Sequence, residues 1–300
     1  MFKRIGLFIL TNIAIIAVIT LIIFILERVF WINISGGPWS SYTSILIYSA
    51  VIWFSWAFIS LFISKWMAKR AYKIQIFKEN NISELNRKEY IVWETVERLA
   101  NSNGIKMPEV WIYIDDEPNA FATGYSKNSS LVAVSSGLLD NMSEDAVEWV
   151  VGHEMAHILN WDMVTMTLLQ WVVNTFVVFA ARILANIFDN VTDWKFGVWG
   201  YMWVNILLQI TFGVLASLIT SKFSRYREFR ADEGSARFLW KEKMIAWLEA
   251  LKTMQNRMHE ADPKMASMQI SSKKKWGIMA LFSTHPDLDD RIAALENLRI

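Results

Sequence analysis

Two of the four histidines in this 300-residue chain lie four positions apart, in the stretch HEMAH at residues 153–157. Side chains at that spacing share one face of a helix, so His153 and His157 can bind one tetrahedral zinc ion from the same side. A catalytic zinc also holds a water molecule and lowers its pKa towards about 7. Glu154 would take the proton of that water as it attacks a peptide carbonyl, and later deliver it to the leaving amine.

Such a site needs a third protein ligand. The chain has no cysteine, so only His, Asp or Glu can supply it. The remaining histidines, His259 and His285, are candidates that spacing does not favour. The stretch SRYREFRAD (224–232) offers an alternative, because Glu228 and Asp232 lie four apart on one helical face.

The composition argues against a purely soluble protein, since 54% of the residues are hydrophobic and 20% are charged. Four apolar runs, at 5–26, 42–63, 164–188 and 196–220, are long enough to form membrane helices. The first run is longer than the apolar part of a signal peptide and lacks a small-residue cleavage site after it. The net charge of +1 gives no electrostatic basis for nucleic-acid binding.

Basic residues near the ends of the four runs predict their orientation. The clusters lie before the first run, after the second and after the fourth: Lys3 and Arg4; Lys65, Lys69 and Arg70; and Lys222, Arg225, Arg227 and Arg230. All three fall on one side of the membrane, which is therefore expected to be cytoplasmic. Both termini and both candidate ligand stretches then face the cytosol.

The parts outside the apolar runs are predicted to be soluble. Helical periodicity covers residues 84–100, strand patterns cover 110–114 and 130–135, and Ser143 is a plausible N-cap for a helix that carries the histidine pair. We expect a multi-pass α-helical membrane protein with a cytoplasmic α+β zincin-like metalloprotease domain. The expected division is a helix pair (1–63), the α+β part (64–163), a second helix pair (164–220) and a helical part with the third ligand (221–300).

Seven stretches resemble one known family in order along the whole chain: SKWMA (64–68), NAFATG (119–124), SLVAVSSGLL (130–139), HEMAH (153–157), DMVTMTL (162–168), SRYREFRAD (224–232) and THPDLDDR (284–291). On these motifs the chain resembles the HtpX family of membrane-embedded zinc metalloproteases, which are distant relatives of the CAAX prenyl proteases.

The resemblance implies a role for each matching residue. It implies one Zn²⁺ per chain, held by His153, His157 and Glu228, with Glu154 as general base. Asp232 resembles a carboxylate that orients a ligand histidine. His285 and Arg291 match a family pair that stabilises the developing oxyanion or steadies Glu228. The substrate-docking edge, to which an extended peptide would add as a strand, is implied at Asn119, Ala120, Val132 and Val134.

The function implied by the resemblance is cleavage of misfolded or unfolded membrane proteins at the cytoplasmic face of the bacterial inner membrane. The bilayer, polypeptide substrates and other quality-control proteases would be its partners, in a stress response. Two positions depart from the family pattern: Trp161 replaces a usual Gly, and Arg230 replaces a frequent His. They motivate the alternative of a catalytically silent, zinc-binding membrane adaptor that keeps the protease fold.

Overall fold

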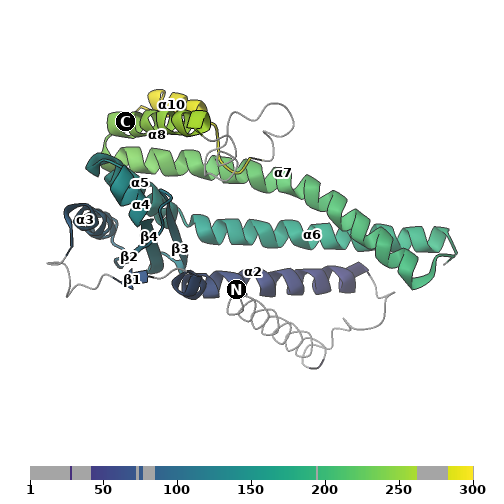
Figure 1. The fold of residues 1–300 in the computed structure, drawn as a ribbon. Coiled ribbons are helices and arrows are strands. Elements are labelled where there is room, and N and C mark those ends of the chain that lie inside the picture. Colours follow the sequence, from purple (N-terminus) through teal and green to yellow (C-terminus); the bar gives the residue numbers. More distant parts are fainter. Residues whose placement is uncertain are drawn as a thin grey trace. The chain divides into compact units, whose positions relative to one another are not determined.

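The computed structural model describes residues 42–71, 74–76, 85–193, 195–261 and 283–299, together with Arg28. The chain divides into two compact units (Figure 1). The first comprises Met1–Leu61 and Met166–Thr220, and the second comprises Phe62–Thr165 and Ser221–Ile300.

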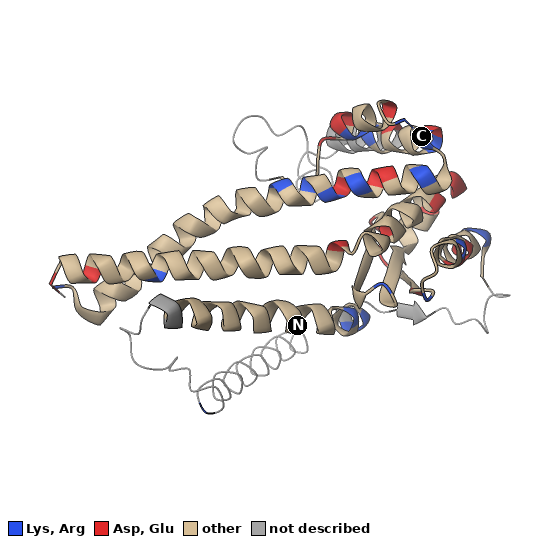
Figure 2. Ribbon diagram, turned by 180° about the vertical axis from the view of Figure 1, so that it is seen from behind, with Lys and Arg blue, Asp and Glu red and all other residues tan. Residues whose placement is uncertain are grey.

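Three long apolar helices supply the first unit, and each extends at one end into the second: α2 (Tyr42–Ala71), α6 (Asp162–Val191) and α7 (Gly197–Leu239). By length and composition all three could cross a membrane, with mean hydropathies of 2.0, 1.7 and 1.9. Figure 2 shows long stretches of these helices almost free of charged residues. The predicted runs at 42–63, 164–188 and 196–220 correspond to these helices, and the run at 5–26 lies outside the described residues.

Within the first unit, polar and aromatic contacts join α2 to α6. The indole Nε1 of Trp171 donates a hydrogen bond of 3.0 Å to the carbonyl oxygen of Ala50, and the ring of Trp171 meets Phe54 edge-on at 5.3 Å. The guanidinium of Arg182 lies 4.7 Å from the ring centre of Tyr48. Arg182, a charge inside an apolar run, therefore has an aromatic partner.

A four-stranded sheet lies at the centre of the second unit. Its strands are β1 (Ile74–Ile76), β2 (Glu109–Tyr113), β3 (Ala120–Ser126) and β4 (Ser129–Ser135), in the spatial order β1-β2-β4-β3. β2 and β4 are parallel, whereas β3 and β4 form an antiparallel hairpin. Gly124 in this hairpin has φ 147°, and a Cβ there would lie 2.3 Å from the carbonyl oxygen of Ser129. The hairpin therefore requires glycine at this position.

Three helices pack against the sheet: α3 (Arg87–Ser102), α4 (Ser136–Asn141) and α5 (Glu144–Leu159) (Figure 1). Their apolar faces share one core with alternate residues of β2 and β4, including Val132 and Val134. The Ser143 side chain accepts a hydrogen bond from the Ala146 backbone N–H at 3.3 Å, so the predicted N-cap is confirmed.

The histidine-bearing helix does not continue into the membrane run that follows it. Helix α5 ends at Leu159, and α6 begins at Asp162. Between them Trp161 has φ 61°, in the left-handed region that favours glycine. The bend at Trp161 gives α5 and α6 separate axes, and it places Asp162 in the first turn of a new helix.

The last part of α7 and two further helices, α8 (Lys241–Ala261) and α10 (Leu288–Glu296), complete the second unit. Their buried residues form a second apolar cluster that includes Trp149 of α5, Leu239, Leu248 and Leu288. Figure 1 shows α8 and α10 side by side. This cluster holds the end of α7 against α5, and so brings together two helices that carry candidate metal ligands.

Candidate metal centre and active site

The two histidines of α5 face each other across a short gap. His153 and His157 are 8% and 9% exposed, and their Nε2 atoms are 3.2 Å apart. Their rings meet nearly at right angles, at 86°. One helical turn separates the two residues, so α5 alone sets this geometry.

Glu228 of α7 completes the group and is 3% exposed. Its Oε2 lies 3.6 Å from Nε2 of His153, and its Oε1 lies 3.5 Å from Nε2 of His157. Within the described ranges, His153, His157 and Glu228 are the one group of three side chains found that could hold a metal ion. The structure therefore brings together the three ligands that the resemblance implied.

A carboxylate lies behind each histidine. His153 Nδ1 is 3.0 Å from Asp232 Oδ1, off the line of an ideal hydrogen bond, and His157 Nδ1 is 2.6 Å from Asp162 Oδ2. Asp162 has no role in the sequence-based prediction, although it begins the matched stretch DMVTMTL (162–168). The sequence feature that could have identified it is its position, five residues after His157 and directly after a residue that is usually glycine in the family.

The chemistry of these donors fits a metal ion. A proton on each Nδ1, facing its carboxylate, leaves the lone pairs of both Nε2 atoms directed into the same gap. Two such lone pairs repel each other unless a cation lies between them. In a tetrahedral zinc site with Zn–N bonds of about 2.0–2.1 Å, two nitrogens are roughly 3.3–3.4 Å apart. The observed separations of 3.2–3.6 Å are close to that value.

The charged groups around His153 also favour a cation at this site. Burial by itself lowers the pKa of His153, but the neighbouring carboxylates of Asp232 and Glu228 outweigh it and raise that pKa to about 10. The site thus stabilises positive charge at this imidazole strongly enough to overcome desolvation.

Arg291 and His285 approach the metal group from the C-terminal segment. Arg291 is 6% exposed and donates two hydrogen bonds to Asp232, from Nε at 2.7 Å and from a terminal nitrogen at 2.5 Å. His285 is more accessible, and its Nδ1 lies 3.1 Å from Glu228 Oε2. The two residues therefore have different partners: Arg291 is paired with the buried carboxylate of Asp232, and the more exposed His285 contacts Glu228.

Glu154 is half-buried and lines the cavity beside the histidines. Burial raises the pKa of its carboxyl group, against the opposing influence of His157, His153 and a backbone hydrogen bond from Ala122. A carboxylate with a raised pKa is a better proton acceptor than a solvated one.

The cavity in front of these residues has a volume of about 510 Å³ and is bordered by β3. Asn119 and Ala120, two predicted substrate residues, line it. The prediction for Val132 and Val134 was wrong. Both are fully buried in β4, which pairs with β2 on one side and with β3 on the other, so no backbone groups remain there for a peptide. The free edge of the described sheet on this side is β3.

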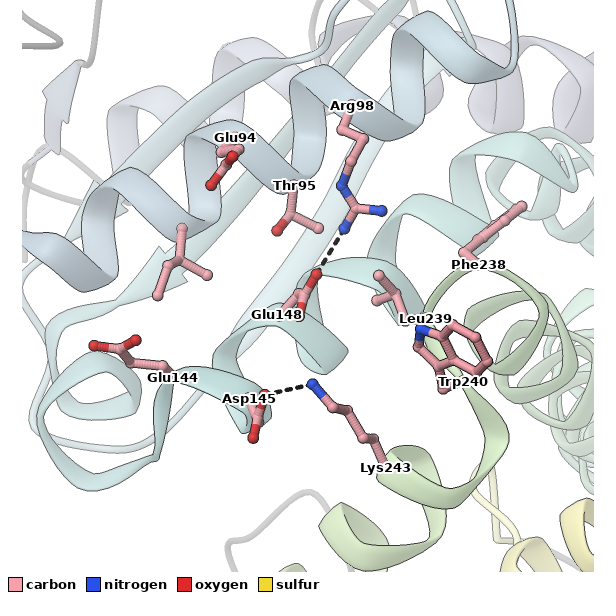
Figure 3. A pocket seen from close by; sticks show the side chains of 11 residues that line it. Glu94, Thr95, Arg98, Glu144, Asp145, Glu148, Phe238, Leu239, Trp240 and Lys243 are labelled. Carbon is pink, nitrogen blue, oxygen red and sulfur yellow. Dashed lines mark hydrogen bonds and ion pairs between the residues drawn. The ribbon is translucent and has the colours of Figure 1, made fainter.

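A second cavity, of about 330 Å³, lies against the opposite face of α5. Figure 3 shows two ion pairs inside it, between Arg98 and Glu148 and between Lys243 and Asp145, at 2.6 Å and 2.8 Å. These pairs link α3 and α8 to α5. No histidine lines this cavity, so it lacks the metal-binding side chains that line the first cavity.

The two departures from the family pattern leave the metal group intact. Arg230 is exposed and its guanidinium is 3.4 Å from Asn160 Oδ1. Trp161 is 44% exposed, and the ammonium of Lys127 lies 5.5 Å from its ring centre. Neither side chain lines the catalytic cavity.

Trp161 nevertheless holds a conformation that costs an L-residue roughly 1–2 kcal/mol. We expect the variant Trp161→Gly to be more stable than Trp161→Ala by about 1 kcal/mol, because both lose the indole and only glycine relieves the strain. Inside a regular helix, by contrast, alanine gives the more stable protein and glycine the less stable one. Urea unfolding in detergent micelles, followed by circular dichroism, compares them. An alanine variant as stable as the glycine variant would contradict the strained conformation.

The fold and the site together define a class of protein, a metallopeptidase with two ligands on an HExxH helix and a carboxylate on a later helix. Comparison of the chain with known protein families identifies the family. Residues 86–299 match peptidase family M48. The chain belongs to that family, and it is a membrane-associated metalloprotease.

Its relatives within the family are named Protease HtpX. The chain is 47% identical to Protease HtpX of Alkalilimnicola ehrlichii over 304 residues, which cover 99% of this chain and 98% of the relative. It is 43% identical to Protease HtpX of Tolumonas auensis, over 99% of this chain and 100% of the relative. The resemblance noted from the motifs is thereby confirmed.

The fold also has a solved counterpart. The crystal structure of S. mikatae Ste24p matches with a TM-score of 0.62, over 93% of this chain and 67% of that chain. At 18% sequence identity, this similarity shows a shared fold.

Proposed function

We propose that the chain is a zinc-dependent endopeptidase that cuts unfolded segments of membrane proteins at the cytoplasmic membrane face. The observation that carries the proposal is the convergence of two imidazoles and one carboxylate within 3.2–3.6 Å, with Glu154 on the wall of the same open cavity. A zinc ion held there would polarise the scissile carbonyl and activate water near neutral pH.

Each residue around the metal would have a separate role in catalysis. Glu154 accepts the proton of the attacking water and delivers it to the leaving amine. Asp162 and Asp232 hold the two ligand imidazoles in orientation through their Nδ1 atoms. Arg291 fixes Asp232 and so acts through it, whereas His285, at the cavity wall, can donate to the developing oxyanion.

The substrate would bind as an added strand along β3. The backbone N–H of Ala122 donates a hydrogen bond to Glu154, so this edge lies beside the carboxylate that we propose as the general base. Backbone hydrogen bonds give affinity for any extended peptide and none for a folded helix. That property supports unfolded protein as the substrate, with Asn119 and Ala120 at the entrance of the edge.

The position along the chain supports the membrane setting. Helix α6 enters its apolar stretch directly after Asp162, and Glu228 follows the apolar stretch of α7 by eight residues. Basic residues follow the apolar stretches of α2 and α7, which supports a cytoplasmic face for residues 64–163 and 221–300. Misfolded inner-membrane proteins, met during stress and shared with other quality-control proteases, are then the substrates within reach.

Removal of the metal tests the proposal. We expect the full chain, purified in detergent, to contain about one zinc per chain and to cleave an unfolded protein such as β-casein. A chelator should abolish cleavage, and added Zn²⁺ should restore it, because no other group on the cavity wall can activate water in this way. Metal content by atomic absorption and cleavage by mass spectrometry are the measurements.

Two other outcomes separate the alternatives. Zinc-loaded protein that leaves several unfolded substrates intact would favour the adaptor that Trp161 and Arg230 motivated. Cleavage that continues after the chelator has removed all zinc would overturn the metal-dependent mechanism.

A further inference from the structure

Three exposed aromatic side chains of the second unit each lie against a basic side chain. In each pair the cationic group is 5.3–6.0 Å from the ring centre: Arg70 over Trp66 on α2, Lys127 of the β3–β4 turn over Trp161 before α6, and Arg230 over Tyr226 on α7. The three rings are 44–57% exposed, and none belongs to the apolar cores. The pairs are therefore a feature of the protein surface.

The pairs lie where the three long helices meet their apolar stretches. Trp66 and Trp161 are each three residues from an apolar run, and Tyr226 is six residues from one. Six residues span about 9 Å of helix, and the headgroup layer of a bilayer is roughly 5–8 Å thick on each side. Figure 2 shows Lys and Arg gathered at these ends of α2 and α7. In a chain whose apolar stretches cross the membrane, the pairs lie at the level of the headgroups.

The β3–β4 hairpin connects the first pair to the second. Phe62 lies one helical turn before Trp66, and its ring centre is 5.0 Å from that of Tyr125. Tyr125 in turn precedes Lys127 by two residues. Phe62 and Tyr125 are themselves exposed, so aromatic surface continues from α2 onto the hairpin.

A hydrogen bond connects the second pair to the third. The guanidinium of Arg230 donates to Oδ1 of Asn160 at 3.4 Å, and Asn160 is the chain neighbour of Trp161. The three pairs thus form one patch of the second unit, which we call the aromatic–basic surface: Trp66, Arg70, Lys127, Trp161, Tyr226 and Arg230.

The charge of this surface is not neutralised by carboxylates. Among the residues that the structure describes, no ion pair involves Arg70, Lys127 or Arg230. By contrast Lys69, the neighbour of Arg70, pairs with Glu109 at 2.6 Å. A ring takes up only one side of a cation, so the remaining N–H donors can bind an anion. The surface therefore suits a negatively charged partner.

This surface contains both departures from the family pattern, Trp161 and Arg230. Trp161 keeps its strained backbone conformation although its side chain does not line the catalytic cavity. Strain of this kind is often associated with a function of the residue. Trp and Tyr rings favour the interface between membrane and water, because their apolar bodies enter the lipid while their polar edges stay hydrated.

We propose that the aromatic–basic surface lies in the headgroup layer and binds anionic phospholipid. The rings enter the upper part of the lipid, and Arg70, Lys127 and Arg230 extend to the phosphates. The bilayer is the partner because the surface continues directly from the apolar helices and its charge is opposite to that of anionic lipid. The binding holds the β3–β4 hairpin at the membrane surface, and it does not depend on the proposed peptidase function.

A fluorophore on the hairpin tests the binding. The chain contains no cysteine, so Ser126→Cys, between Tyr125 and Lys127, provides one labelling site in the full chain. The labelled protein is reconstituted into phosphatidylcholine vesicles that contain spin-labelled phosphatidylglycerol or spin-labelled phosphatidylcholine at equal mole fraction. We expect both lipids to quench the fluorophore, and phosphatidylglycerol to quench about fivefold more effectively, which is roughly the contribution of one basic residue at an anionic surface.

Charge variants show whether Lys127 causes the preference. In the labelled protein, Lys127→Gln should lower the quenching ratio by about fivefold, and Lys127→Arg should preserve it. The matched control is Lys243→Gln, which removes a lysine that pairs with Asp145 on the wall of the second cavity and should leave the ratio unchanged. A fluorophore at Glu242→Cys, which follows the apolar run of α7 by more than 20 residues, should be quenched by neither lipid.

Three results would overturn the proposal. A fluorophore at residue 126 that neither lipid quenches would show that the hairpin lies outside the bilayer and is open to a protein partner instead. Equal quenching by the two lipids, or a ratio that Lys127→Gln leaves unchanged, would exclude selective binding of anionic headgroups. None of these measurements involves cleavage, so they test the surface whether or not the chain proves to be a peptidase.

Discussion

The variant Glu154→Gln is expected to lose cleavage activity by about 10²–10⁴-fold while it keeps its metal. Glutamine has the shape of glutamate but cannot accept a proton. Its amide oxygen can still accept the hydrogen bond from the Ala122 backbone, so the β3 edge should stay in place. The histidines and Glu228, which are the candidate metal ligands, are untouched. The loss should therefore fall on kcat, with little change in KM.

The matched control for this variant is Glu148→Gln. Glu148 lies on the same helix but faces the second cavity, where it pairs with Arg98 (Figure 3). This surface pair is worth about 0–1 kcal/mol, so the control should fold and retain activity. Steady-state cleavage of a peptide, with metal content measured on the same samples, distinguishes the variants. Undiminished activity in zinc-loaded Glu154→Gln would show that another group is the base.

The helix that carries the histidine pair could be predicted because its determinants are local. Ser143 caps its first turn, and the spacing of His153 and His157 fixes their common face once the segment is helical. The long apolar helices were predicted for the same reason, since about 20 apolar residues in a row suffice to indicate them. None of these inferences depends on which distant segments of the chain pack against each other.

The predictions that failed depended on pairing between distant segments. The alternation in 130–135 indicates a strand, but whether that strand is interior or at an edge depends on where β2 and β3 lie. Val132 and Val134 were assigned to a docking edge by resemblance to the family. Parallel pairing of β2 with β4, which leaves no local trace in either segment, instead puts β4 inside the sheet. Strand β3 itself was missed, because AFATGYS is rich in small residues and has weak alternation.

Asp162 shows how one backbone conformation can conceal a candidate site residue from sequence analysis. With an uninterrupted helix from α5 into α6, the carboxylate would point away from His157. The left-handed conformation of Trp161 turns the chain, so that Asp162 reaches His157 Nδ1 at 2.6 Å. Trp161, which as a departure from the family pattern motivated the silent adaptor, lies at the bend that brings Asp162 to His157.

The variant Glu228→Ala is expected to lose both zinc and activity. Two imidazoles and water remain, and zinc peptidase sites hold their metal with three protein ligands. The loss of affinity should exceed the about 10–100-fold expected when an orienting carboxylate is removed. Competition with a chromophoric chelator measures the affinity. The matched control is Glu233→Ala on the same helix, whose carboxylate pairs with exposed Arg237.

His285 is the rival for the third ligand position, because its Nδ1 lies 3.1 Å from Glu228 and its ring borders the same cavity. If Glu228 is the ligand, His285→Ala should bind zinc with nearly wild-type affinity and lose activity through weaker stabilisation of the oxyanion, by up to about 10²–10³-fold. If His285 is the ligand, His285→Ala should lose the zinc and Glu228→Ala should retain it. Zinc affinity thus assigns the ligand independently of catalysis, because only the true ligand is needed to hold the metal in the absence of substrate.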